Sequence, residues 1–122
     1  MIAEPFDACS PLMTAENLRG SVALAERGHC SFLTKAINVE SAGSMALIVI
    51  DNDPNNEYFV EMIGDNTDRI SHIPSVFLNW LDGNLIKNSI ESKKLSGAKI
   101  NIPLNVTLTS KAKLKKTPWA YW

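Results

Sequence analysis

The feature that most constrains the fold is an unbroken aliphatic run of strand length, Met45-Ala-Leu-Ile-Val-Ile50. Because no polar residue interrupts it, we expect a central strand that is buried on both faces. The preceding residues predict a helix that begins after the N-cap Ser31, runs to about Ala42 and ends at Gly43. Residues 22–26 alternate as a strand does. A strand, helix, strand order favours a right-handed crossover between parallel strands.

The segments around this unit predict loops and shorter strands. The first 20 or so residues contain Pro5, Pro11 and Gly20, which indicates an irregular lead-in. The Asp- and Asn-rich stretch at 51–56 predicts a surface loop. Strands are expected at 58–63 and at 75–79, the second one held extended at its start by a proline.

Two further elements are expected in the last third of the chain. Asp82 is predicted to cap a second helix that ends near Gly97 and directs three side chains inward, Leu85, Ile86 and Ile90. Residues 100–108 alternate between apolar and polar side chains, which predicts a strand with one buried and one solvated face. Pro103 cannot donate a backbone hydrogen bond, so this strand should lie at a sheet edge or carry a bulge.

Length and charge restrict the classes of protein to which the chain can belong. Its 122 residues suit a single domain over residues 1–122 with one hydrophobic core. The formal net charge of −1 gives no overall field that would attract nucleic acid or an anionic membrane. The run at 45–50 is too short to cross a bilayer. The start of the chain lacks the pattern of a signal peptide, so secretion would require a precursor segment upstream of Met1, and the alternative is a cytosolic protein.

Side chains that could support catalysis or bind a metal ion are few. With His29 and His72 as the two histidines, a Cys30 nucleophile would need His72 to be brought across the fold. These three residues and Cys9 lack the paired spacing that is typical of zinc sites. We therefore expect no catalytic residues, no cofactor and no metal site.

The polar loop gives a partial match to a calcium-binding loop. Asp51, Asp53 and Asn55 occupy the first three ligand positions. The match fails at Asn56, where the turn requires glycine, and again where the bidentate glutamate belongs. A solvated loop is the favoured interpretation, with weak calcium binding by Asp51, Asp53 and Asp65 as the alternative.

Three features each allow two interpretations. Cys9 and Cys30 form either a disulfide or two separate buried thiols. The triplet Asn105-Val-Thr is the single N-glycosylation sequon, and Asn105 falls on the polar face of its expected strand, which favours a real glycan over a chance match. The tail, residues 111–122, carries lysines and tryptophans that could dock at an anionic surface, although packing of the tryptophans on the domain is favoured.

Several segments together form a recognisable pattern: Cys9, Gly20-Ser-Val-Ala-Leu-Ala-Glu-Arg-Gly-His-Cys-Ser-Phe32, Lys35, Ala42-Gly43, Ala46-Leu-Ile-Val-Ile-Asp-Asn52, Ile73-Pro74 and Asp82-Gly83. This pattern resembles the protease-associated (PA) domain family over essentially the whole chain. The resemblance implies an α/β fold built on an open β-barrel or sandwich and flanked by two or more helices. It also implies that Cys9 pairs with Cys30 and that Asn105 is glycosylated. Family members have a strand before the first cysteine, for which only eight residues remain here.

The resemblance further implies recognition without catalytic groups. We expect a non-catalytic module of a secreted or lumenal glycoprotein that binds a protein or peptide partner through two loops, with these candidate residues: Arg27, Gly28, His29, Asp51, Asp53 and Asn55. One alternative is a structural role as a homodimer through a sheet edge that the missing N-terminal strand would leave unpaired. Another is a hydrolase accessory with cryptic activity around His29, Cys30 and Asp51.

Overall fold

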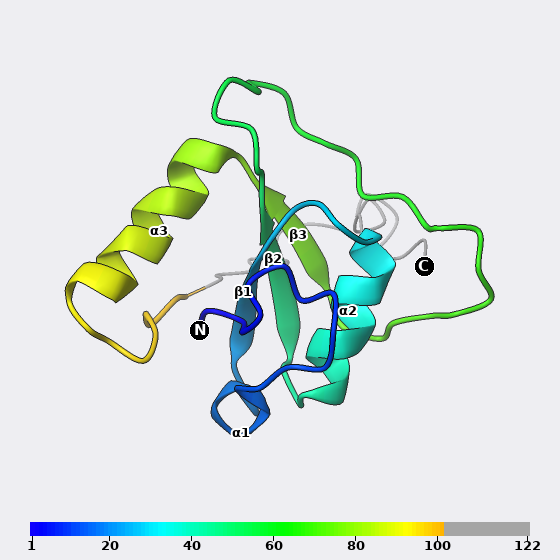
Figure 1. Cartoon of the computed structure of the whole chain (residues 1–122), viewed down its shortest axis with the longest axis horizontal. Coiled ribbons are helices and arrows are strands. Elements are labelled where there is room, and N and C mark those ends of the chain that lie inside the picture. Colours follow the sequence, from blue (N-terminus) through cyan, green and yellow to red (C-terminus); the bar gives the residue numbers. More distant parts are fainter. Residues whose placement is uncertain (102–122) are drawn as a thin grey trace, which may run out of the picture.

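The computed structural model describes residues 1–101 of the chain, and these residues form a three-stranded parallel sheet flanked by helices (Figure 1). The sheet has the order β1-β2-β3 and is not closed within this part of the chain. The strands are β1 (Val22–Glu26), β2 (Ala46–Ile50) and β3 (Ser75–Leu78), and the helices are α1 (Ala15–Leu18), α2 (Phe32–Ser41) and α3 (Trp80–Ser92). Residues 102–108 of the expected last strand, the Asn105 sequon and the tail lie outside the described residues.

Ala46–Ile50 of the aliphatic run form the central strand, as predicted, whereas Met45 precedes the strand and is 64% exposed. The two faces of the strand pack against different elements. β2 pairs in parallel with β1 on one side and with β3 on the other. One face packs against α2. The core there consists of Ala23, Ala25, Leu47 and Val49 from the strands, with Ala36 and Val39 from α2. Ser31 caps α2 as expected, because its hydroxyl accepts the Thr34 N–H at 3.1 Å.

The opposite face of the sheet receives α3. Successive side chains of a strand point to opposite faces, so Leu24, Ile48 and Ile50 lie on the side away from α2. Gly83 of α3 sits directly on Ile50, since a Cβ at position 83 would come within 2.3 Å of that side chain. The fold is therefore a sheet covered by one helix on each face.

The free edge of β1 is paired with the start of the chain. Ile2 forms a parallel bridge with Leu24, flanked by hydrogen bonds from the Leu24 N–H to the Met1 carbonyl at 2.8 Å and from the Ala3 N–H to the Leu24 carbonyl at 2.9 Å. This bridge lies before Cys9, in the segment where the resemblance implies a strand. It leaves little of β1 unpaired for association with a second chain.

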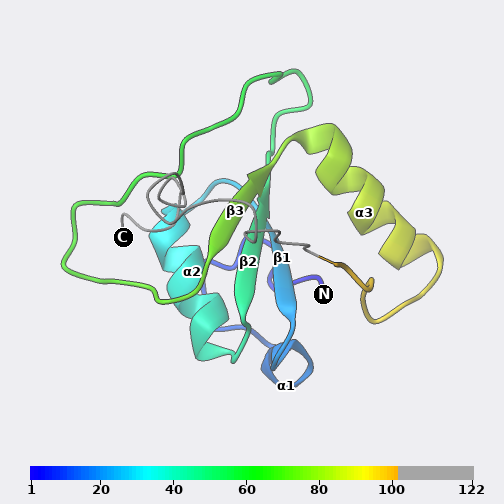
Figure 2. The same ribbon diagram turned by 180° about the vertical axis from the view of Figure 1, so that it is seen from behind.

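A long connection, residues 51–74, joins the carboxyl end of β2 to the amino end of β3, and the view from behind shows that it swings out past α2 (Figure 2). Side-chain hydrogen bonds attach this connection to the two ends of α2. Asp65 accepts a hydrogen bond from the Ser31 hydroxyl at 2.8 Å, and Glu40 accepts one from the Ser71 hydroxyl at 2.9 Å.

Several expected elements are wrong in detail. Residues 58–63 do not form a strand, because they find no neighbouring strand among the described residues, and both Tyr58 and Phe59 are exposed. α3 is capped by Asn79 rather than Asp82: the Asn79 side chain accepts the Asp82 N–H at 2.8 Å. The helix ends at Ser92 instead of continuing to about residue 97. The short α1 lies in the segment expected to be irregular.

The inward face of α3 also differs from the expectation. Ile90 is buried as predicted and Ile86 is half-buried, but Leu85 is 61% exposed. The buried stripe begins at Gly83, and residues three and seven positions later share that side of the helix. Leu85 falls outside this stripe.

Candidate functional site

The two loops singled out in the sequence meet at the carboxyl edge of the sheet, where open α/β folds usually bind their ligands. The Arg27 N–H donates to the Ile50 carbonyl at 2.8 Å, and the Asp51 N–H donates to the Leu78 carbonyl at 2.9 Å. These bonds extend the sheet register into the loops. Arg27 and Asp51 therefore lie side by side, and their side chains form an ion pair with Nη1 and Oδ1 3.1 Å apart.

Asp51 carries a buried negative charge, and both of its carboxylate oxygens have partners. Its side chain is 0% exposed, and its second oxygen accepts a hydrogen bond from Asn56 Nδ2 at 2.6 Å. Burial by itself would raise the pKa of Asp51, but the hydrogen bonds from Asn56, Arg27 and the Asp53 N–H outweigh it and hold the pKa below its usual value. Asp51 therefore has a structural role, because it accepts hydrogen bonds from groups of its own loop. The expectation of a solvated loop is wrong for this residue.

Asp53 and Asn55 lie on the exposed part of the same loop. The Asp53 carboxylate accepts the Asn55 N–H at 2.9 Å, so this bond shapes the turn. Within residues 1–101, no group of three or more acidic, histidine or cysteine side chains is placed to hold a metal ion.

The other loop, residues 27–30, is held by a disulfide and by a buried lysine. Cys9 and Cys30 are bonded to each other. Lys35 of α2 is 0% exposed, and its ammonium donates to the Gly28 carbonyl at 2.7 Å and to the Asp7 carbonyl. Gly28 has φ +106, in the region that favours glycine, and a Cβ there would lie 3.2 Å from the Asn52 side chain. The two loops are therefore packed against each other.

His29, in this loop, has Asp7 as its polar partner and makes no hydrogen bond to Cys30 or Asp51. Its side chain is 73% exposed, and Nδ1 lies 3.2 Å from a carboxylate oxygen of Asp7. Cys30 is oxidised and Asp51 is bound to Arg27. The structure does not bring His29, Cys30 and Asp51 together as a nucleophile, base and orienting group.

An exposed aromatic pair follows the Asp51 loop along the chain, in a segment that the sequence analysis placed in a strand. Tyr58 and Phe59 are 83% and 81% exposed, and they follow the anchored turn at Asn56, whose side chain accepts the Tyr58 N–H at 3.1 Å. The sequence signal that could have revealed this exposed pair is the occurrence of two large aromatic residues directly after an Asn-rich turn. Such side chains are the usual anchors of protein–protein contacts.

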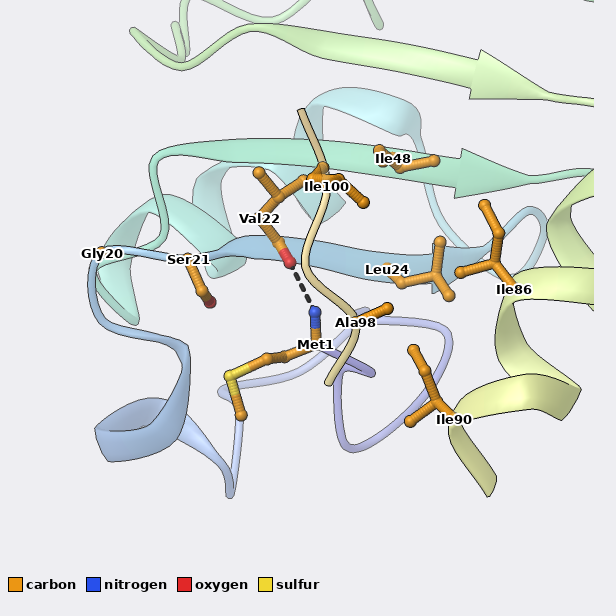
Figure 3. A pocket seen from close by; sticks show the side chains of 10 residues that line it. All are labelled: Met1, Gly20, Ser21, Val22, Leu24, Ile48, Ile86, Ile90, Ala98 and Ile100. Carbon is orange, nitrogen blue, oxygen red and sulfur yellow. Dashed lines mark hydrogen bonds between the residues drawn. The ribbon is translucent and has the colours of Figure 1, made fainter. Parts of the chain in front are cut away.

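A pocket lies on the α3 side of the sheet, between β1, α3 and the chain around Ile100 (Figure 3). Its volume is about 260 Å³, and its walls are mostly hydrocarbon, from side chains that include Leu24, Ile48 and Ile90. The polar atoms at its rim are already bonded: the Met1 amino group to the Val22 carbonyl at 2.8 Å and the Ser21 hydroxyl to the Leu18 carbonyl at 2.7 Å. This pocket offers packing surface and no acid–base pair.

Comparison with known proteins links this arrangement to one family. The PA domain profile matches residues 2–86. The chain is 39% identical to the PRADC1-like protein of Drosophila melanogaster over 125 residues, which cover 100% of this chain and 64% of that protein. It is 36% identical to ER degradation-enhancing alpha-mannosidase-like protein 3 of Homo sapiens over 94 residues, 72% of this chain and 10% of that protein.

A third relative is signal peptide peptidase-like 2 of Arabidopsis thaliana, 34% identical over 103 residues, which cover 84% of this chain and 18% of that protein. The chain therefore spans less than two thirds of the length of each of these relatives. Within residues 1–101, no helix is long and apolar enough to cross a membrane.

Proposed function

Because the chain belongs to the PA domain family, we propose that it is a non-catalytic module that binds a protein or peptide partner in the secretory pathway. One observation carries the proposal: the loops at the carboxyl edge of the sheet form a fixed platform beside two exposed aromatic side chains. The platform is held by the Arg27–Asp51 ion pair and by the Cys9–Cys30 disulfide. Preformed surfaces of this kind lose little conformational entropy on binding.

The proposed contact surface consists of Gly28 and His29 from one loop and of Asp53, Asn55, Tyr58 and Phe59 from the other. The Arg27–Asp51 ion pair joins the two loops beneath this surface, since Asp51 is fully buried. The aromatic side chains would supply the apolar contact area and the loop polar groups its specificity.

The secretory location is supported by the disulfide and by the relatives. Disulfides form and persist in oxidising compartments and are rare in the cytosol. Relatives named for ER degradation and for signal peptide peptidases contain the matching region. We also propose that Asn105 carries a glycan, which intact mass of the secreted chain before and after glycosidase treatment would detect.

The side chains at the platform support a non-catalytic role. Arg27 is paired with Asp51, His29 contacts Asp7, and the two sulfur atoms are bonded to each other. The dimer alternative is weaker than the sequence indicated, because Ile2 occupies the β1 edge on which it was based.

The proposal is tested by affinity capture of the glycosylated, disulfide-bonded chain after reversible cross-linking in secretory cells. The chain is compared with a Tyr58→Ser, Phe59→Ser double variant and with Met13→Ser, a control whose side chain is 80% exposed and lies outside both loops. We expect proteins captured by the unaltered chain and by the control to be lost from the double variant. Recovery of the same proteins by all three, each with an unaltered melting temperature, would refute the proposed surface.

A further inference from the structure

The buried lysine beside the disulfide has an unusual set of partners. Lys35 Nζ lies 3.5 Å from Cys9 Sγ, and it also donates to the carbonyl groups of Asp7 and Gly28. An ammonium has three N–H donors, so each of them has one partner. Two of those partners are neutral carbonyl groups and the third is a disulfide sulfur.

No carboxylate within residues 1–101 forms a salt bridge with Lys35, and residues 102–122 contain no Asp or Glu. Asp7 and Glu26 are the nearby acids. The Asp7 carboxylate is engaged with the Cys9 N–H at 3.1 Å and with His29 at 3.2 Å. Buried charges are normally paired, so the missing anion calls for an explanation.

We propose that the disulfide is a thiol-exchange site, at which the thiolate of a reducing agent attacks Cys30 Sγ and Cys9 leaves as a thiolate opposite the Lys35 ammonium. The attacking sulfur forms a bond to Cys30 as the Cys9–Cys30 bond breaks, and the electron pair of that bond remains on Cys9. A second thiolate of the reducing agent then attacks the mixed disulfide, which frees Cys30 and oxidises the reducing agent to its own disulfide. No proton has to be transferred in the first step.

The direction of attack follows from the position of the cation. A positive charge next to a cysteine lowers the pKa of its thiol, and a thiol with a lower pKa is the better leaving group. Lys35 contacts Cys9 Sγ, and no contact with Cys30 Sγ accompanies it. Release of Cys9 would also supply the anion that the buried ammonium lacks.

We expect Lys35 also to hold the two cysteines close together after reduction, so that the disulfide can form again. Lys35 joins the Asp7 and Gly28 carbonyl groups, which lie on the two segments that the disulfide links. These bonds do not depend on the oxidation state of the sulfur atoms. The two cysteines are therefore expected to stay close after reduction, and only the covalent restraint on residues 28–30 is lost.

The first test uses the unaltered protein. Brief exposure to reduced glutathione is followed by an acid quench, alkylation of free thiols and peptide mapping. We expect glutathione on Cys30 and the alkyl group on Cys9. Glutathione mainly on Cys9, an even distribution, or no adduct at all under conditions that reduce an unfolded control would overturn the proposal.

The second test measures the rate of reduction by dithiothreitol in Lys35→Met and in Lys93→Met, a control that removes an exposed lysine at the end of α3. We expect Lys35→Met to be reduced more slowly by about threefold or more, the change that a one-unit shift in a thiol's pKa typically produces. A rate equal to that of Lys93→Met, or faster, contradicts the role of Lys35. Should Lys35→Met not fold, the glutathione mapping still decides the proposal.

Discussion

Replacing Gly83 by alanine tests how α3 is seated on the sheet, because two opposing effects can be weighed from the structure. In an exposed helix interior this change stabilises by about 1 kcal/mol, since glycine loses more backbone entropy than alanine. At position 83, the new Cβ would lie 2.3, 2.6 and 2.9 Å from three atoms of the Ile50 side chain. None of these is an allowed contact, so the helix or the strand must shift.

Overpacking of a core typically destabilises a protein by about 1–3 kcal/mol. Because the new Cβ overlaps three atoms of one buried side chain, we place the cost of Gly83→Ala at the upper end of this range. After the gain in helix propensity, we expect a net loss of about 2 kcal/mol in the free energy of unfolding. For a domain of this size the melting temperature would fall by about 8 °C.

The assay is urea and thermal unfolding of Gly83→Ala beside a matched control, Gly64→Ala, where an added Cβ meets nothing within 4 Å. The control should be neutral or slightly stabilised, because alanine restricts the unfolded chain. Ile50→Ala removes two of the three overlapping atoms, so the double variant with Gly83→Ala should be more stable than the sum of the single changes. Stabilisation by Gly83→Ala alone would refute the close contact.

Three further results are expected. Arg27→Met should lower the free energy of unfolding by about 1–2 kcal/mol, because it removes the charged partner of the buried Asp51 carboxylate. Arg69 forms a more exposed ion pair with Asp65, with Nη2 and Oδ2 2.6 Å apart, so Arg69→Met should have a smaller effect, and equal effects would argue against burial of Asp51. Asn79→Ala should cost about 1 kcal/mol by removing the cap of α3, measured as a lower urea midpoint, and an unchanged midpoint would mean that the cap contributes nothing. Hydrogen bonds hold the folded-state pKa of Asp51 and of Asp65 below the unfolded value, for Asp65 chiefly those from the Thr67 and Ser31 hydroxyl groups. The stability these carboxylates add is therefore present above the unfolded pKa and is lost as pH falls through the folded one. Urea midpoints should decline below about pH 4 and decline less in Asp65→Asn, whereas a flat profile in the unaltered protein would contradict these hydrogen bonds.

The central part of this fold could be predicted because its local signals agree. An uninterrupted aliphatic run favours a strand that is buried on both faces. Ser31 marks the start of α2, because its hydroxyl accepts a hydrogen bond from a free backbone N–H of the first turn. Parallel pairing of β1 and β2 followed from the helix between them.

The errors arose where partners distant in the sequence decide the outcome. Residues 58–63 have the composition of a strand, but strand formation requires a neighbour, and none is present in the described part of the chain. On α3, the sequence pattern predicted three apolar side chains as the inward face and gave Gly83 no place on it, whereas Gly83 is the residue that touches the sheet. That contact sets which side of the helix is buried and leaves Leu85 in solvent.

For the candidate site, the sequence indicated which loops to consider but not the structural role of each residue. The turn at 27–29 and the polar stretch at 51–56 indicated two candidate binding loops, yet this interpretation gave Asp51 the same status as Asp53, although Asp51 is buried and is paired with Arg27. The contact of Lys35 with Cys9 also depends on packing, since these residues are far apart in the chain.

The most direct test of the binding surface is site-specific photo-cross-linking in secretory cells, with the reactive amino acid placed at Phe59 in one sample and at Met13 in the other. Both side chains are at least 80% exposed, so access to solvent does not favour either position. We predict a cross-linked protein partner at position 59 that is absent at position 13. Cross-links to the same proteins at both positions, or at position 13 alone, would contradict recognition through the carboxyl edge of the sheet.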